Sequence, residues 1–243
     1  MTSRNLSIPA QDRLIFALDL PSPEDALRLA ERLRPQVQLF KVGLEAYLAG
    51  GNDLVRRIGA LGARVFLDLK LLDIPATVSK ALRVIDSQHA NVVFATIHVL
   101  NNAVPDLVRK AALTRLKVLA VTALTSKDES DLRGEGIPQS MAEYVTALAE
   151  RALSLGVHGV ISSAWEARAL RERFGPSLLI VTPGIRPAWA EVSGDDQKRA
   201  ATPAEAIRGG ADYLVVGRPI RDAKDPLDAA RRVQEEIREA LGG

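Results

Sequence analysis

The chain has 243 residues, a length that allows one large α/β domain or two smaller domains with separate cores. Its 32 lysines and arginines are nearly balanced by 30 aspartates and glutamates, so the net charge of +2 argues against a nucleic-acid-binding surface. The absence of cysteine excludes disulfide bonds, thiolate metal sites and a thiol nucleophile.

The hydropathy pattern argues against a membrane protein and against a secreted one. No apolar run approaches the ~18 residues of a membrane span. The first residues, MTSRNLSIPAQDR, lack the apolar core of a secretory signal. We therefore expect a soluble, cytoplasmic protein.

Short apolar runs rich in β-forming residues alternate with helical patterns along the chain. The runs are Arg13–Leu20, Leu39–Gly43, Arg64–Lys70, Val92–Leu100, Lys117–Leu124, Gly159–Ser163, Leu178–Ile185 and Tyr213–Ile220. Eight strand-helix units of this size predict a single (β/α)8 barrel over residues 1–243. An open doubly wound sheet is the alternative, but no G-x-G-x-x-G motif follows the first strand.

Start and stop signals frame the helices between these strands. Predicted helix starts are Ser22-Pro23, Ser163–Glu166, Thr202–Glu205 and Asp225-Pro226, of which the second and third have the form of capping boxes. Gly156 and Gly175 stand where helices should end. Residues 126–140 and 186–201 are predicted to be long loops after strands.

Charged residues recur at the predicted carboxyl ends of the strands, where barrel enzymes place their catalytic groups. Lys41, Asp68 and Lys70 lie in apolar strand ends, and Asp19 and Asp73 follow strands closely. Asp68 and Lys70 are two residues apart on one strand, so we expect both to point to the same face. Opposite charges nearby keep a lysine protonated. This favours proton donation by Lys70 over imine chemistry, although a salt bridge that closes a barrel layer is the structural alternative.

The two last strands are followed by residues suited to bind an oxyanion. Gly184 and Arg186 follow the seventh strand, and Gly217 and Arg218 follow the eighth. Barrels bind phosphate with these two loops, and the arginine fork meets two phosphate oxygens at once. Gln197, in the long loop after the seventh strand, is a further candidate donor on a segment long enough to act as a lid.

Histidine and metal chemistry receive little support. His98 lies inside an apolar run, where a packed histidine is the more frequent finding, and His89 and His158 are expected at the opposite end of the barrel. Asp68 and Asp73 alone could hold Mg²⁺, but the ammonium group of Lys70 would compete with the ion. No metal and no cofactor are therefore expected.

The residues of the third strand resemble a known family. Residues 68–77 read DLKLLDIPAT, which is similar to the D-x-K-x-x-D-I-P-x-T signature of the orotidine 5′-phosphate decarboxylase family. Further similar segments are Ala17–Asp19, Phe40–Gly43, Leu124–Ser126, Thr182–Arg186 and Val216–Ile220. The resemblance implies a (β/α)8 barrel that forms a homodimer and converts orotidine 5′-phosphate to UMP and CO₂, the last step of de novo pyrimidine nucleotide synthesis.

The resemblance also implies roles for individual residues. Lys70 would donate the proton, Asp68 would face the departing carboxylate, and Lys41 and Asp73 would complete a Lys41-Asp68-Lys70-Asp73 array. Thr77 would reach, with Asp73, into the partner subunit's site. The implied substrate contacts are Asp19 and Lys41 at the ribose, Thr125 and Ser126 at the pyrimidine, and Arg186, Gln197, Gly217 and Arg218 at the phosphate.

Two departures and two alternatives accompany this resemblance. His98 is followed by Val99-Leu100-Asn101-Asn102 in place of the common Ala-x-Gly-Gly, and Leu72 replaces a common histidine. A Mg²⁺-dependent sugar-phosphate decarboxylase, as in the 3-keto-L-gulonate 6-phosphate group, shares the D-x-K-x-x-D core. A non-catalytic phosphate-binding barrel is the alternative from another class.

Overall fold

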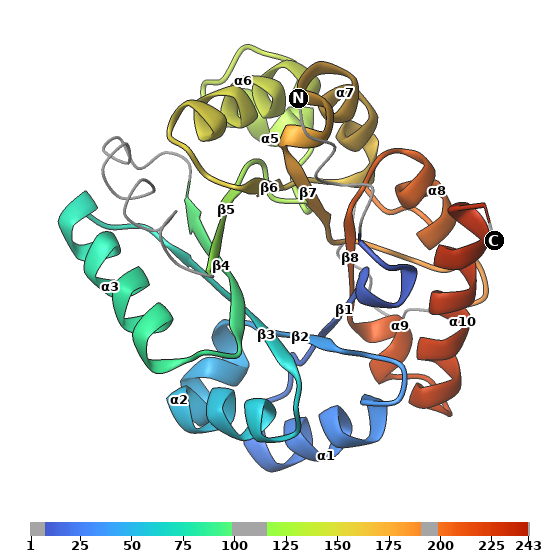
Figure 1. The fold of residues 1–243 in the computed structure, drawn as a ribbon. Coiled ribbons are helices and arrows are strands. Elements are labelled where there is room, and N and C mark those ends of the chain that lie inside the picture. The colour runs from blue at the N-terminus through green and yellow to red at the C-terminus, as the bar shows by residue number, and fades with distance from the viewer. Residues whose placement is uncertain (1–7, 99–115, 191–198, 243) are drawn as a thin grey trace.

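The computed structural model describes residues 8–98, 116–190 and 199–242 of the chain. Eight parallel strands close into a barrel in the order β1-β2-β3-β4-β5-β6-β7-β8, and the helices surround it (Figure 1). This is the (β/α)8 barrel that the sequence predicts. None of the helices in the described part of the chain has the length and apolar character needed to span a bilayer.

All eight predicted strands are present, but most are shorter than their apolar runs. The strands are β1 (Leu14–Ala17), β2 (Leu39–Val42), β3 (Arg64–Leu71), β4 (Val92–His98), β5 (Lys117–Val121), β6 (Gly159–Ile161), β7 (Leu179–Thr182) and β8 (Tyr213–Val216). The run that begins at Tyr213 was expected to be extended as far as Ile220. It leaves the sheet after Val216, and Arg218 begins a short helix instead.

The helices begin largely where the sequence predicts. They are α1 (Pro23–Leu33), α2 (Leu44–Ala60), α3 (Pro75–Gln88), α5 (Glu129–Gly134), α6 (Met141–Ser154), α7 (Ala164–Phe174), α8 (Pro203–Arg208), α9 (Arg218–Arg221) and α10 (Pro226–Ala240), with 3-10 turns η1 (Ala10–Asp12) and η2 (Gly175–Ser177). Ser22 and Asp225 cap helices α1 and α10, and Thr202 forms the predicted capping box of α8.

Two local predictions are wrong. Residues 126–140, expected to be a loop, contain helix α5, which Asp128 and Asp131 start with a reciprocal capping box. Ser163 does cap α7 by accepting a hydrogen bond from Trp165 N, but Glu166 does not complete a capping box. The carboxylate of Glu166 accepts a hydrogen bond from Ser163 Oγ and is also paired with Arg199, 33 residues further along the chain.

The core has two layers, one inside the barrel and one between the strands and helices. Inside, Phe66, Phe94 and Tyr213 meet edge to face, with ring centroids 6.0 and 5.1 Å apart. Outside, Phe16 and Phe40 face the helices and are fully buried. Because the barrel interior is filled with side chains, a ligand can enter only above this layer, at the carboxyl ends of the strands.

Candidate active site

The alternation of strands β2 and β3 explains why charged residues stand at the mouth of the barrel. Leu39 and Phe66 belong to the interior layer, while Phe40 and Leu67 pack toward the helices. The period of two therefore turns Lys41 inward, as it does Asp68. The side chains of Lys41 and Asp68 are each only 12% exposed, so both charges need partners close by.

Those partners form a row of alternating charge, here called the charged row: Asp19, Lys41, Asp68 and Lys70. Lys41 Nζ lies 2.9 Å from Asp19 Oδ1 and 3.8 Å from Asp68 Oδ2. Lys70 Nζ lies 2.9 Å from the same Asp68 oxygen. Asp68 thus stands between two ammonium groups, which offsets the free energy of burying its carboxylate.

The contact between Asp68 and Lys70 is present as predicted, but a regular pleat does not produce it. Leu67 is in register with Ala95 of β4, and Leu71 is in register with Ile97. The three residues 68–70 therefore lie opposite Thr96 alone. Lys70 has a φ of 50°, and it is the only non-glycine residue with positive φ in the described part of the chain. This register slip, rather than alternation, brings the Lys70 ammonium group to Asp68.

A cavity of about 320 Å³ opens beside the charged row and is here called the mouth cavity. The sequence-predicted residues that line it are Asp19, Lys41, Thr125, Gly184, Arg186, Gly217 and Arg218. Asp68 and Lys70 do not line the cavity themselves, and Lys41 connects them to it. The mouth cavity therefore joins an arginine-rich end to the charged row.

Arg221 is a further cation at this cavity, and the sequence reading missed it. Its guanidinium donates to the carbonyl oxygen of Asp19 at 2.9 Å and to the carboxylate of Asp222 at 2.6 Å. That hydrogen bond to Asp222 raises the pKa of Arg221 above its ordinary value. Arg221 lies three residues after Arg218 in helix α9, a spacing that places both on one helix face. The sequence signal was the pair of arginines three residues apart in the segment Arg218-Pro219-Ile220-Arg221.

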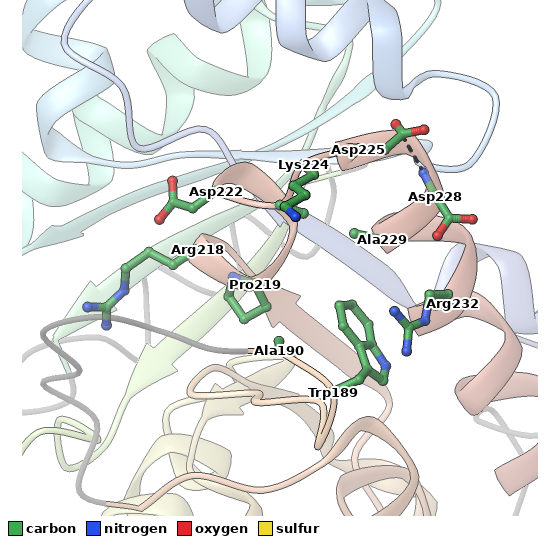
Figure 2. A pocket seen from close by; sticks show the side chains of 11 residues that line it. Trp189, Ala190, Arg218, Pro219, Asp222, Lys224, Asp225, Asp228, Ala229 and Arg232 are labelled. Carbon is green, nitrogen blue, oxygen red and sulfur yellow. Dashed lines mark hydrogen bonds between the residues drawn. The ribbon is translucent and has the colours of Figure 1, made fainter.

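A second cavity, of about 480 Å³, borders the first at Arg218 (Figure 2). The Arg232 guanidinium stacks 4.0 Å from the centroid of the Trp189 ring, whose Nε1 donates to Glu236 at 2.7 Å. Figure 2 shows the guanidinium of Arg218 pointing away from this stacked pair. Arg218 is therefore turned away from the Trp189 side of the second cavity.

Besides Asp68 and Lys70, four further predicted site residues are not among those that line the mouth cavity. Ser126 is exposed beyond Thr125. Asp73 and Thr77 are exposed at the start of α3, where Asp73 Oδ1 accepts a hydrogen bond from Ile74 N at 2.6 Å. Gln197 lies outside the described residues. Within one chain, the charged row joins Lys41, Asp68 and Lys70 of the expected array to Asp19.

Arg199 is a buried cation that ties the connection before α8 to neighbouring strand ends. Its Nη1 lies 2.5 Å from Glu166 Oε1, and its Nη2 donates to the carbonyl oxygen of Leu124 at 2.9 Å. The side chains of Arg199 and Glu166 are 4% and 7% exposed. Because Leu124 precedes Thr125, this pair anchors the segment that carries one wall of the mouth cavity.

His98 ends strand β4, at the carboxyl end of the barrel. Burial and the positive charge of Lys127 lower the pKa of His98 below its ordinary value of 6.5, so the neutral imidazole is favoured at pH 7. Within residues 8–98, 116–190 and 199–242, His, Asp and Glu form no group of three or more that could hold a metal ion.

Comparisons with known proteins point to one family. Residues 12–233 match the family model described as "Orotidine 5'-phosphate decarboxylase / HUMPS family". The chain is 45% identical over 238 residues to the orotidine 5′-phosphate decarboxylase of Methylococcus capsulatus, and the match covers 98% of this chain and 96% of that protein. It is 46% identical to the enzyme of the same name from Bradyrhizobium diazoefficiens, with 97% and 98% covered.

The similarity extends to solved structures. The crystal structure of orotidine 5′-phosphate decarboxylase from Lactobacillus acidophilus superposes with a TM-score of 0.79 at 34% sequence identity, covering 93% of this chain and 99% of that chain. The corresponding enzyme from Pyrococcus horikoshii gives a TM-score of 0.72 at 24% identity, with 93% and 99% covered, which supports the fold alone. The family match spans every strand of the barrel.

Proposed function

The chain belongs to the orotidine 5′-phosphate decarboxylase / HUMPS family, and on that premise we propose that it decarboxylates orotidine 5′-phosphate to UMP and CO₂. This carboxy-lyase reaction is the last step of de novo pyrimidine nucleotide synthesis. The observation that carries the proposal is the charged row beside an arginine-lined cavity. We take residues 1–243 as one catalytic barrel that works in the cytoplasm without metal or cofactor.

The mouth cavity gives each part of the nucleotide a suitable partner. Arg186 and Arg218 would bind the phosphate group, because the guanidinium fork suits its oxygens, and Gly217 lies beside them. Asp19 and Lys41 would bind the ribose hydroxyls. Thr125 would lie by the pyrimidine, with Ser126 beyond it, and Gln197 would join the phosphate end.

The chemical difficulty is to leave an electron pair on a ring carbon that has no electron sink. The bond from that carbon to the carboxylate breaks, CO₂ leaves, and the pair stays on the carbon. We assign Lys70 to stabilise this carbanion electrostatically and then to protonate it through Nζ, after which water restores the ammonium group. Asp68 holds Lys70 at 2.9 Å and would repel the substrate carboxylate until CO₂ departs.

Asp73 and Thr77 enter the proposal through a second copy of the chain. Both are exposed, and Asp73 stands between two exposed apolar side chains, Leu72 at 60% and Ile74 at 67%. Such exposed apolar groups favour burial against another protein surface. We propose a homodimer in which Asp73 and Thr77 of each subunit reach the partner's site.

A direct assay tests the reaction. Purified protein is incubated with orotidine 5′-phosphate, and CO₂ and UMP are measured with and without EDTA. We expect turnover that EDTA leaves unchanged. Loss of activity with EDTA and its return with Mg²⁺ would contradict a metal-free mechanism. Absence of CO₂ release from orotidine 5′-phosphate, together with Mg²⁺-dependent decarboxylation of 3-keto-L-gulonate 6-phosphate, would favour the sugar-phosphate decarboxylase alternative. Binding of UMP without any CO₂ release would favour a non-catalytic phosphate-binding barrel.

Subunit mixing tests the homodimer. Lys70→Ala and Asp73→Asn proteins are each expected to be nearly inactive. If Asp73 crosses the interface, a mixed dimer of the two has one site with both residues intact. Random reassociation should then restore about a quarter of wild-type activity, because half the dimers are mixed and each has one good site. No gain on mixing, with exchange shown by a tag, would reject the crossing.

A further inference from the structure

We propose that Thr96 is a positioning residue that holds Lys70 and Asp68 in their catalytic arrangement; the inference rests on the proposed function. Thr96 lies in β4, next to the charged row, and it is fully buried. Nothing in its side chain can donate a proton to substrate at neutral pH, and it does not line the mouth cavity. Its influence must therefore pass through the residues that it contacts.

The hydroxyl of Thr96 makes two hydrogen bonds, one to each residue. It accepts a hydrogen bond from Lys70 N at 2.9 Å. It donates to Asp68 Oδ1 at 2.9 Å, while the other carboxylate oxygen of Asp68 faces Lys70 Nζ at 2.9 Å. The Thr96 hydroxyl oxygen thus fixes both the backbone of Lys70 and the orientation of the Asp68 carboxylate, which the Lys70 ammonium group contacts.

The backbone of Lys70 explains why such a hold is needed. A φ of 50° is left-handed, a conformation that is unfavourable for a residue with a side chain and that persists only where surrounding contacts enforce it. The slip between Leu67 and Leu71 interrupts the regular pairing of β3 with β4 at this point. The Thr96 hydroxyl takes the place of a strand partner for Lys70 N, and so supports the conformation that turns the lysine to Asp68.

The carboxylate of Asp68 needs the same support for a different reason. Its Oδ2 is attracted to both Lys41 and Lys70, at 3.8 and 2.9 Å. The bond from Thr96 to Oδ1 resists rotation of the carboxylate about its Cβ–Cγ bond toward either cation. Loss of the hydroxyl would leave Asp68 Oδ1 and Lys70 N without this partner, and the ammonium group would shift relative to the reacting carbon.

Two substitutions separate the hydroxyl from the shape of the side chain. Thr96→Val keeps the branched shape and removes the hydroxyl, whereas Thr96→Ser keeps the hydroxyl and removes a methyl group. We expect Thr96→Val to lower kcat by about 10- to 100-fold, the loss that small misplacements of catalytic groups cause. The affinity for UMP should stay within about twofold, because Thr96 does not touch the mouth cavity. Thr96→Ser should keep kcat within about threefold of wild type.

A matched control is available in the neighbouring strand end. Thr122 is also buried and donates its own hydroxyl hydrogen bond, to Ile161 O at 2.8 Å. Thr122→Val removes a hydrogen bond of the same kind away from the charged row, so it should lower stability but leave kcat unchanged. Urea unfolding of all variants shows how much of each sample is folded, and crystal structures show the φ of Lys70.

The outcomes are decisive in each case. The proposal is overturned if Thr96→Val keeps kcat within twofold, if Thr96→Ser loses as much as Thr96→Val, or if Thr122→Val loses as much. If Thr96→Val does not fold, Thr96→Ala replaces it, and failure of both to fold would make the role of Thr96 structural and reject the proposal. Absence of turnover in the wild-type protein would instead reject the proposed function, a result that needs no variant.

Discussion

Replacement of Arg199 by methionine should destabilise the barrel strongly, because it leaves Glu166 buried without its counter-charge. The Glu166 side chain is 7% exposed, and Arg199 Nη1 lies 2.5 Å from it. Arg199 also donates to Leu124 O at 2.9 Å and lies 3.4 Å from Ser163 Oγ. Methionine fills a similar length but supplies none of these donors.

The size of the effect follows from the burial of the pair. Removing one partner of a buried ion pair costs about 3–5 kcal/mol, chiefly because the remaining charge is left uncompensated. For a domain of this length, each kcal/mol corresponds to a change in melting temperature of about 2–4 °C. We therefore expect Arg199→Met to lower the melting temperature by about 6–20 °C, and Glu166→Leu to do the same.

The double variant separates the pair from its surroundings. Arg199→Met combined with Glu166→Leu removes both charges, so no uncompensated charge remains. Arg199 Nε is also buried without a hydrogen-bond partner among the described residues. The double variant removes the free-energy cost of burying this unpaired group as well. Its free energy of unfolding should lie within about 2 kcal/mol of the wild-type value, although the hydrogen bond to Leu124 O is lost.

A double-mutant cycle measures this coupling. The free energy of unfolding in urea is followed by circular dichroism for the wild type, both single variants and the double variant. The expected coupling energy is about 3 kcal/mol or more in magnitude, well beyond the scatter of independent sites. Single variants that lose less than about 1 kcal/mol would refute the reasoning. A double variant whose loss equals the sum of the single losses would also refute it, because the two side chains would then act independently.

Three further predictions concern single residues. Lys70→Ala should abolish CO₂ release while UMP still binds, measured by radioactive CO₂ capture and calorimetry; full turnover would remove Lys70 from the mechanism. Arg218→Ala should weaken UMP binding by at least tenfold but hardly change uridine binding, and an unchanged UMP affinity would count against a phosphate contact. Burial and the charge of Arg56 lower the pKa of His89 below 6.5. Just below pH 6.5, His89 is therefore protonated more often in the unfolded chain than in the folded chain. Stability should therefore fall as the pH drops just below 6.5, and His89→Gln should flatten this slope in urea titrations without altering kcat.

The fold and the set of residues at the mouth of the barrel could largely be predicted, because both depend on local sequence patterns. Apolar runs at a spacing of one βα unit predict the barrel, and residues at strand ends converge on one face whatever their loops do. This is why Asp19, Lys41 and Arg218 meet at one cavity although they are far apart in sequence. The end of β8 could not be predicted, since Pro219-Ile220 continues the apolar run into helix α9.

The long-range hydrogen bonds that position the residues at the barrel mouth could not be predicted from local sequence patterns. Thr96 and Asp68 are 28 residues apart, and Arg199 and Leu124 are 75 apart. Neither pair carries a spacing signal, because the contact depends on register and on the path of a loop. The prediction of a capping box at Ser163–Glu166 is wrong for the same reason. The Glu166 carboxylate also binds Arg199, which is too far away in sequence for helix-capping rules to include.

The register slip in β3 has a consequence for attempts to build new enzymes. An ideal barrel strand that carried aspartate and lysine two positions apart would copy the motif but not the backbone that turns Lys70 toward Asp68. Design methods that favour regular strands would remove this irregularity. The smallest transferable unit is therefore a pair of strands, which includes the slipped β3 segment and the Thr96 hydroxyl on β4, rather than a stretch of sequence.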